Sequence, residues 1–160
     1  MEYELAIEGA PDVVPGGTGV LLVHPSTGET DRDVDETKAD ILDTLSVERG
    51  YSRRPSDHVH YVSAPDDLAG IVEITREFLA GSEGKRRISL DSITEMAYYA
   101  DEDRAMAAVE EILALLEEYD AAGLFHLSGE VHDDAALAEF RALFDGVITL
   151  DADGSVTAEF

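Results

Sequence analysis

Short apolar runs alternate with segments of helical periodicity along most of this chain. The apolar runs lie at 20–23, 41–45, 59–62, 88–91 and 124–127. Three segments between and after the later runs have apolar residues at the three- and four-residue spacing of an amphipathic helix. They are 66–79, 101–119 and 133–144. Strands that alternate with helices form parallel sheets, because parallel neighbours need a long crossover. The pattern therefore predicts an α/β fold, with a mostly parallel sheet and helices on both faces.

The C-terminal segment predicts an antiparallel addition to this sheet. Two short strands, 147–150 and 156–159, flank the turn sequence Asp-Ala-Asp-Gly at 151–154. A glycine at the end of so short a connection is typical of a β-hairpin. With 160 residues, we expect one domain that spans 1–160. The chain has no cysteine, which excludes a disulfide framework and thiol chemistry.

The charge of the chain is strongly negative. It has 36 acidic and 11 basic residues, for a formal net charge of -25. Salt screens the repulsion among such charges, so we interpret the acidic surface as an adaptation to a salt-rich cytoplasm. A partner-binding surface is the alternative. Nucleic acid is not expected as a partner, because it requires a basic stripe.

Nothing in the sequence predicts a membrane segment. The first residues are acidic and no long apolar run follows them, unlike a signal peptide. No run approaches the roughly 20 apolar residues of a membrane helix. We therefore expect a cytoplasmic protein with no membrane partner.

The strand at 20–23 leads into a sequence that resembles a phosphate-binding P-loop, G-x-x-x-x-G-K-[ST]. Gly28 and Thr30 match the second glycine and the hydroxyl residue. Val23 replaces the first glycine, and Glu29 replaces the lysine that neutralises phosphate, which reverses the sign of that interaction. The degenerate loop comprises Pro25, Ser26, Thr27, Gly28, Glu29 and Thr30. It favours a nucleotide-binding fold and opposes nucleotide chemistry.

The order of elements is similar to that of the RecA/KaiC superfamily of P-loop ATPases, especially the reduced ATPase-like proteins of halophilic archaea. The segment 86–92 resembles the Walker B strand, whose terminal aspartate helps to hold magnesium in that superfamily. The resemblance implies this role for Asp91. The run at 124–127 resembles the following core strand, and a C-terminal hairpin is usual in the superfamily. The resemblance implies a RecA-like fold.

The chain departs from that superfamily after the loop as well. Only 31–40 separates the loop from the run at 41–45, where relatives have a full helix and normally another strand and helix. A parallel crossover needs about a dozen residues. Either a strand–helix unit is lost, or a segment near 31–36 is omitted from the sequence.

We therefore expect a non-catalytic RecA/KaiC-like domain with a regulatory or protein-interaction role. This interpretation requires no catalytic residue, no metal and no cofactor, and its partner is another protein or a second copy of the chain. The alternative is a nucleotide-binding protein or weak ATPase that uses Thr30 and Asp91 with ATP and magnesium. Open α/β sheets bind ligands at the carboxyl ends of their strands, where Asp91 is expected. In the structural interpretation, Asp91 is a helix cap for the segment from Ser92 onwards or a hydrogen-bonded remnant of the superfamily's site.

Two histidines are expected near the ends of neighbouring core strands. His24 and His126, together with Asp91, would supply two imidazoles and a carboxylate, which can ligate a transition metal. His58 and His60 share one strand face. No tight zinc-binding spacing is present, and isolated core histidines are the simpler interpretation, so no metal is assigned.

Basic residues are concentrated in two segments. Arg49, Arg53 and Arg54 surround Tyr51, and a second cluster spans 85–87. Arginine and tyrosine are favoured at protein interfaces, and arginine also binds phosphate. Salt bridges to the surplus carboxylates are the structural alternative. We regard Arg49, Tyr51, Arg53 and Arg54 as a candidate interface.

Overall fold

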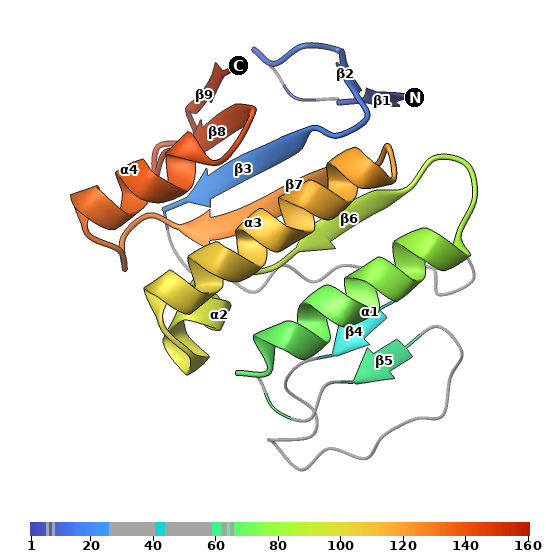
Figure 1. Cartoon of the computed structure of the whole chain (residues 1–160). Coiled ribbons are helices and arrows are strands. Elements are labelled where there is room, and N and C mark those ends of the chain that lie inside the picture. The colour runs from blue at the N-terminus through green and yellow to red at the C-terminus, as the bar shows by residue number, and fades with distance from the viewer. Residues whose placement is uncertain (6, 8, 26–40, 44–58, 62–63, 65) are drawn as a thin grey trace.

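A five-stranded sheet forms the centre of the molecule in the computed structural model (Figure 1). The structure describes residues 1–5, 7, 9–25, 41–43, 59–61, 64 and 66–160. The strand order is β6-β7-β3-β8-β9. The strands are β3 (Gly19–His24), β6 (Arg87–Leu90), β7 (Ala122–Ser128), β8 (Gly146–Leu150) and β9 (Val156–Glu159). Only β9 is antiparallel to its neighbour, which confirms the mostly parallel sheet with a C-terminal hairpin.

Two further pairs of strands lie outside this sheet. The antiparallel pair is β1 (Glu2–Glu4) with β2 (Val13–Pro15), and the parallel pair is β4 (Ile41–Asp43) with β5 (Val59–Tyr61). The second pair confirms strands within the predicted runs 41–45 and 59–62. The first pair was not predicted, because each strand has three residues and buries only its middle one. Such a strand leaves no apolar run in the sequence.

The described residues contain four helices, and three of them follow the periodicity predicted for 66–79, 101–119 and 133–144. The four helices are α1 (Leu68–Gly81), α2 (Ile93–Tyr99), α3 (Glu102–Glu118) and α4 (Asp134–Ala142). Figure 1 shows α3 and α4 in front of the sheet, with α1 beside α3. None of the helices in the described ranges is long and apolar enough to cross a membrane.

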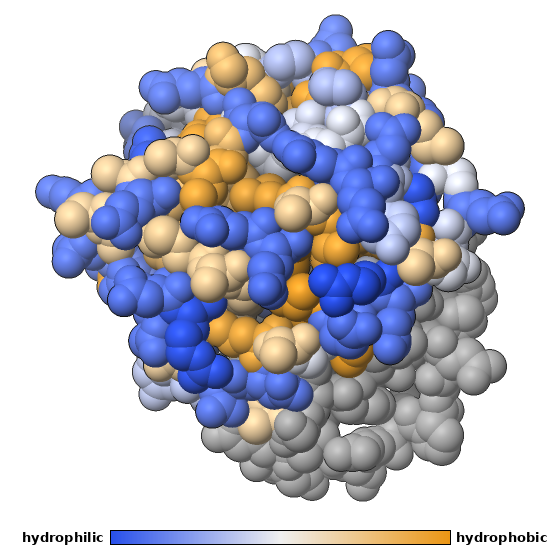
Figure 2. Space-filling view, viewed as in Figure 1, coloured by the Kyte–Doolittle hydropathy of each residue, from blue (hydrophilic) through white to orange (hydrophobic). Residues whose placement is uncertain are grey.

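The main core lies between the sheet and these helices. Leu21 of β3 and Phe125 of β7 are fully buried, and they belong to one cluster with Ile112 of α3 and Phe140 of α4. Within the described residues, the helices that build this cluster cover one face of the sheet. Figure 2 shows that side of the molecule, where hydrophilic residues alternate with strips of hydrophobic ones.

Side-chain caps define where the four helices begin. Asp67, Ser92, Asp101 and Asp133 each accept a hydrogen bond from the amide three residues later, at 2.7 to 3.2 Å. Such a cap satisfies an amide that has no partner within the helix. Helix α3 ends in a Schellman motif, in which the Ala121 amide donates to the Leu116 carbonyl at 2.9 Å.

The terminal hairpin turns as its sequence predicts. Gly154 has a φ of 89°, a left-handed conformation that favours glycine. Within the turn, hydrogen bonds from the side chain and the backbone amide of Ser155 lower the pKa of Asp153.

Candidate functional site

The carboxyl ends of the parallel strands β3, β6 and β7 form one edge of the sheet, which we call the carboxyl edge. These strands end at His24, Leu90 and Ser128. Strand β3 is central, as expected for the strand that leads into a phosphate-binding loop. Of the predicted loop residues, Pro25 is described and partly buried, whereas Ser26, Thr27, Gly28, Glu29 and Thr30 lie outside the described residues.

Val23, at the position of the first P-loop glycine, is part of the core. Its side chain is buried in the main cluster on the helix-covered face of the sheet. A Cβ placed on Gly129 would lie 3.0 Å from Val23 Cγ1, so the chain after β7 passes close to this side chain. Val23 therefore has a packing role that a glycine could not fill.

Asp91 follows β6 directly and is exposed at the carboxyl edge. The cap of α2 is Ser92, whose hydroxyl accepts from the Glu95 amide at 3.2 Å. The cap interpretation of Asp91 is therefore wrong, because the next residue performs that role. The peptide bond between Asp91 and Ser92 is cis.

His24 and His126, which were expected near the ends of core strands, contact each other directly. His24 Nε2 lies 2.8 Å from His126 Nδ1, and the ring planes differ by 11°. The His126 side chain is buried, with 2% of the residue exposed, and its Nε2 lies 3.4 Å from Ser89 Oγ. All three residues lie on the sheet face opposite the main core, since they alternate with Leu21, Val23 and Phe125.

This contact is too short for a metal ion between the rings. Zinc binds imidazole nitrogen at about 2.0 to 2.1 Å, so two nitrogens on one ion lie more than about 3 Å apart. Among the residues that the structure describes, no group of three or more His, Cys, Asp or Glu side chains is arranged to hold a metal ion. His58 lies outside the described residues, and His60 lies in β5.

A second polar cluster joins α2, α3 and β7 at the same edge. Thr94 Oγ1 lies 3.0 Å from His132 Nε2 and accepts from the Ser128 amide at 2.9 Å. His132 Nδ1 lies 3.8 Å from Glu102 Oε2, and 3% of the His132 side chain is exposed. No local pattern in the sequence indicates this cluster, because its members come from separate elements.

Side chains already cap the described helix N-termini at the carboxyl edge, and three of the four caps are carboxylates. In open parallel sheets, a helix N-terminus can bind an anion through its free amides and its dipole. Here the caps of α1, α3 and α4 are aspartates, and the cap of α2 is a serine. Arg104, at the start of α3, donates to the Asp66 carbonyl at 3.2 Å. These described helices offer little attraction for a triphosphate.

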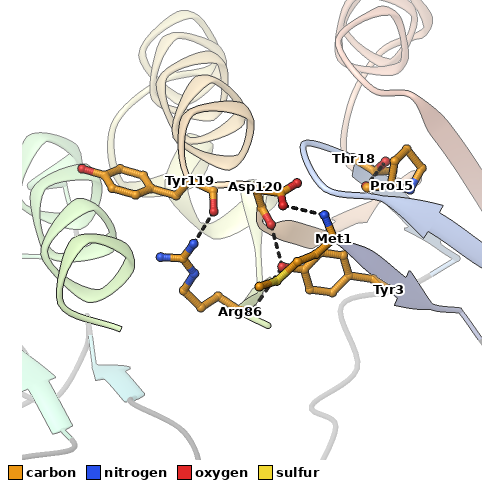
Figure 3. A network of polar contacts seen from close by, with 7 residues as sticks. All are labelled: Met1, Tyr3, Pro15, Thr18, Arg86, Tyr119 and Asp120. Atoms are coloured by element: carbon orange, nitrogen blue, oxygen red, sulfur yellow. Dashed lines mark hydrogen bonds and ion pairs between the residues drawn. The ribbon is translucent and has the colours of Figure 1, made fainter. Parts of the chain in front are cut away.

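At the opposite edge, Arg86 of the basic segment 85–87 has a structural role (Figure 3). The Arg86 guanidinium donates to the carbonyls of Leu79 at 2.5 Å and Ser82 at 3.0 Å, and also to the Tyr119 carbonyl. The Arg86 amide donates to the Tyr3 hydroxyl at 3.2 Å, and that hydroxyl donates to the Asp120 carbonyl at 2.6 Å. Arg86 thus binds the C-terminal ends of two helices.

Salt bridges to carboxylates were the structural alternative for this basic segment. The described guanidinium hydrogen bonds of Arg86 go to backbone carbonyls instead. Its exposed neighbours Lys85 and Arg87 lie 6.0 and 5.5 Å from the Tyr3 ring centre. The candidate interface of Arg49, Tyr51, Arg53 and Arg54 lies outside the described residues.

Residues 1–32 and 33–160 match a family of unknown function, DUF7090. The chain belongs to this family. No curated protein matches this DUF7090 member significantly.

The solved structures that resemble this DUF7090 chain include one bacterial and one archaeal protein. One is an ATPase from the type III secretion system of pathogenic bacteria, with a TM-score of 0.53, 13% identity, and coverage of 88% of this chain and 53% of the ATPase. The chain thus spans about half the length of that ATPase. The other is a KaiC-like protein of the archaeon Pyrococcus horikoshii, with a TM-score of 0.54, 18% identity, and coverage of 86% and 74%. These likenesses show that the DUF7090 chain has a RecA-like fold.

Proposed function

We propose that this chain is a RecA-like domain without nucleotide hydrolysis, which acts in a regulatory role by binding a protein partner or a second copy of itself. The proposal takes 1–160 as one domain that works in the cytoplasm. The observation that carries it is the chemistry of the carboxyl edge, where a RecA-like domain would place its ligand.

Three features of this edge oppose a bound triphosphate. Aspartate carboxylates already cap α1, α3 and α4. His24, the last residue of β3 before the loop, already has a hydrogen-bonding partner in His126. In the sequence, Glu29 stands in place of the P-loop lysine. A triphosphate at this edge would meet fixed negative charge where catalysis requires positive charge.

Calorimetry with ATP, ADP and magnesium in molar KCl tests this proposal, combined with light scattering over a range of protein concentrations. We expect no heat of nucleotide binding, and a mass that rises with concentration or on addition of a partner. Micromolar ATP binding would contradict the proposal. The candidate interface can be tested with the double variant Arg53→Glu, Arg54→Glu, which we expect to reduce the measured mass or the partner binding.

Asp91 favours a second candidate function, a nucleotide-binding protein or weak ATPase. Its carboxylate is exposed directly after β6, at the position that the Walker B resemblance implies for magnesium. With Thr30, it would hold magnesium and ATP. Magnesium-dependent turnover that is lost in Asp91→Asn, and retained in the control Asp103→Asn, would establish this function. Asp103 is also exposed, in the first turn of α3.

A further inference from the structure

The rings of His24 and His126 lie edge to edge and almost in one plane. A nitrogen lies about 1.13 Å from the centre of a five-membered ring whose C–N bonds are about 1.33 Å long. Two rings whose facing nitrogens lie 2.8 Å apart can therefore have centres at most about 5.1 Å apart. The observed centre-to-centre distance is 5.1 Å, with ring planes at 11°. Each nitrogen must therefore point directly at the other.

Only one proton fits between these two nitrogens. A neutral imidazole has one N–H and one lone pair, whereas an imidazolium has two N–H groups. The neutral pair forms one N–H···N bond, and an additional proton can be added at an outer nitrogen without breaking it. A second additional proton would place N–H groups on both facing nitrogens, at 2.8 Å. The bond would then be replaced by repulsion between two positive charges.

Repulsion between His24 and His126 would push apart the ends of β3 and β7 at the carboxyl edge. His24 ends β3, His126 lies within β7, and the Gly129 amide donates to the His24 carbonyl at 2.9 Å. In the described part of the chain, Ser89 and Ser128 share this face of the sheet. The carboxylates nearest along the flanking strands are Asp91 and Asp151, which follow β6 and β8 and are both exposed.

We propose that His24 and His126 form a one-proton switch, in which the folded pair accepts one additional proton and the uptake of a second separates the ends of β3 and β7. The switch is independent of whether a nucleotide binds, because it follows from the way the two imidazole nitrogens face each other.

Nuclear magnetic resonance of the ¹⁵N-labelled full chain tests the switch directly. At neutral pH we expect a scalar coupling between His24 Nε2 and His126 Nδ1, transmitted through the N–H···N bond. On acidification the coupling should persist while the pair takes up one proton and vanish with the second. Below that point, exchange protection of the Gly129 amide, corrected for its intrinsic rate, should fall about tenfold per pH unit, the dependence of an opening linked to one proton.

Two variants separate the switch from a general effect of acid. In His24→Gln, the amide can present either its oxygen or its nitrogen to His126, so the acid-induced loss of Gly129 protection should disappear. In the control His132→Gln, which changes a buried histidine outside the pair, the coupling and the loss of protection should remain. The proposal is overturned if no coupling exists at any pH. It is equally overturned if the pair takes up two protons with the coupling intact, or if His24→Gln loses protection as the parent does.

Discussion

Arg86 is a partly buried arginine that stabilises two helix ends, although in the sequence it stands in a basic cluster. Its guanidinium donates to the carbonyls of Leu79 and Ser82 after α1, and to the Tyr119 carbonyl after α3. These carbonyls have no partner within their helices, and a cation near a helix C-terminus is favoured by the helix dipole. One side chain therefore stabilises the ends of two helices.

We expect Arg86→Ala to lower the free energy of unfolding by about 2 to 4 kcal/mol, because it removes charge-assisted hydrogen bonds and leaves carbonyls unpaired. Urea unfolding in molar KCl measures this change. The matched control is Arg87→Ala, which removes an exposed arginine 5.5 Å from the Tyr3 ring and should cost less than about 1 kcal/mol. Equal losses in the two variants would show that Arg86 has no special role.

The histidines show what sequence can and cannot predict for single residues. Apolar runs predicted that His24 and His126 lie near the ends of core strands, and the structure adds that β3 and β7 are neighbours and that the two rings contact each other. Sequence could not distinguish a metal pair from a hydrogen-bonded pair, because the two differ by less than 1 Å in the distance between nitrogens. Arg86 was noticed for its charge, but its carbonyl partners come from separate helix ends.

At the scale of elements, Thr94 joins α2 to two neighbours. Its hydroxyl accepts from the Ser128 amide at the end of β7, and it lies 3.0 Å from Nε2 of His132, just before α4. Because the Thr94 oxygen already accepts from an amide, its own proton is available to donate to the imidazole. The hydroxyl thus satisfies two buried groups at once.

We expect Thr94→Val to lower the free energy of unfolding by about 2 to 3 kcal/mol, because valine keeps the shape and leaves an amide and an imidazole nitrogen unpaired. Thr75→Val is the matched control. Both threonines are buried, at 8% and 9% exposed, but Thr75 donates only to the Ile71 carbonyl of its own helix. Loss of the Thr75 hydroxyl should lower the free energy of unfolding by less than about 1 kcal/mol. Thermal unfolding of both variants measures these changes. Similar losses in free energy of unfolding would contradict the proposal that Thr94 links α2 to its neighbours.

Elements were predictable where a local signal exists. Helix α3 has an aspartate cap, an apolar stripe and a C-terminal turn, and its structure follows the expected range within one residue at each end. The terminal hairpin was predicted from its glycine turn. The pair β1–β2 was missed, because three-residue strands with exposed neighbours carry no periodicity. The Thr94 cluster depends on contacts between elements, which local patterns do not encode.

At the scale of the whole molecule, the α/β class followed from the alternation of strands and helices, whereas the strand order did not. Strand β7 lies between β3 and β6, although it follows both in the chain. Adjacent runs in the sequence therefore do not become adjacent strands. The RecA/KaiC resemblance supplied the architecture that periodicity alone could not, and the solved structures support it as a fold.

The net charge of -25 predicts a stability that depends strongly on salt. Repulsion among exposed carboxylates opposes the compact state, and raising KCl from 0.1 to 1 M shortens the screening length from about 10 to 3 Å. We expect the midpoint of urea unfolding to rise steadily over this range of KCl. Circular dichroism at 222 nm, recorded during urea titrations, measures it.

A charge-reduced variant tests whether screening is the cause. Four exposed glutamates of α3 can be replaced by glutamine: Glu110, Glu111, Glu117 and Glu118. Glutamine has nearly the same helix propensity as glutamate, so the helix itself should be little affected. The variant should be more stable than the parent at 0.1 M KCl and should gain less from added salt, because fewer carboxylates repel one another. If both proteins gained equally from KCl, salt would be acting through apolar burial rather than through screening of charge.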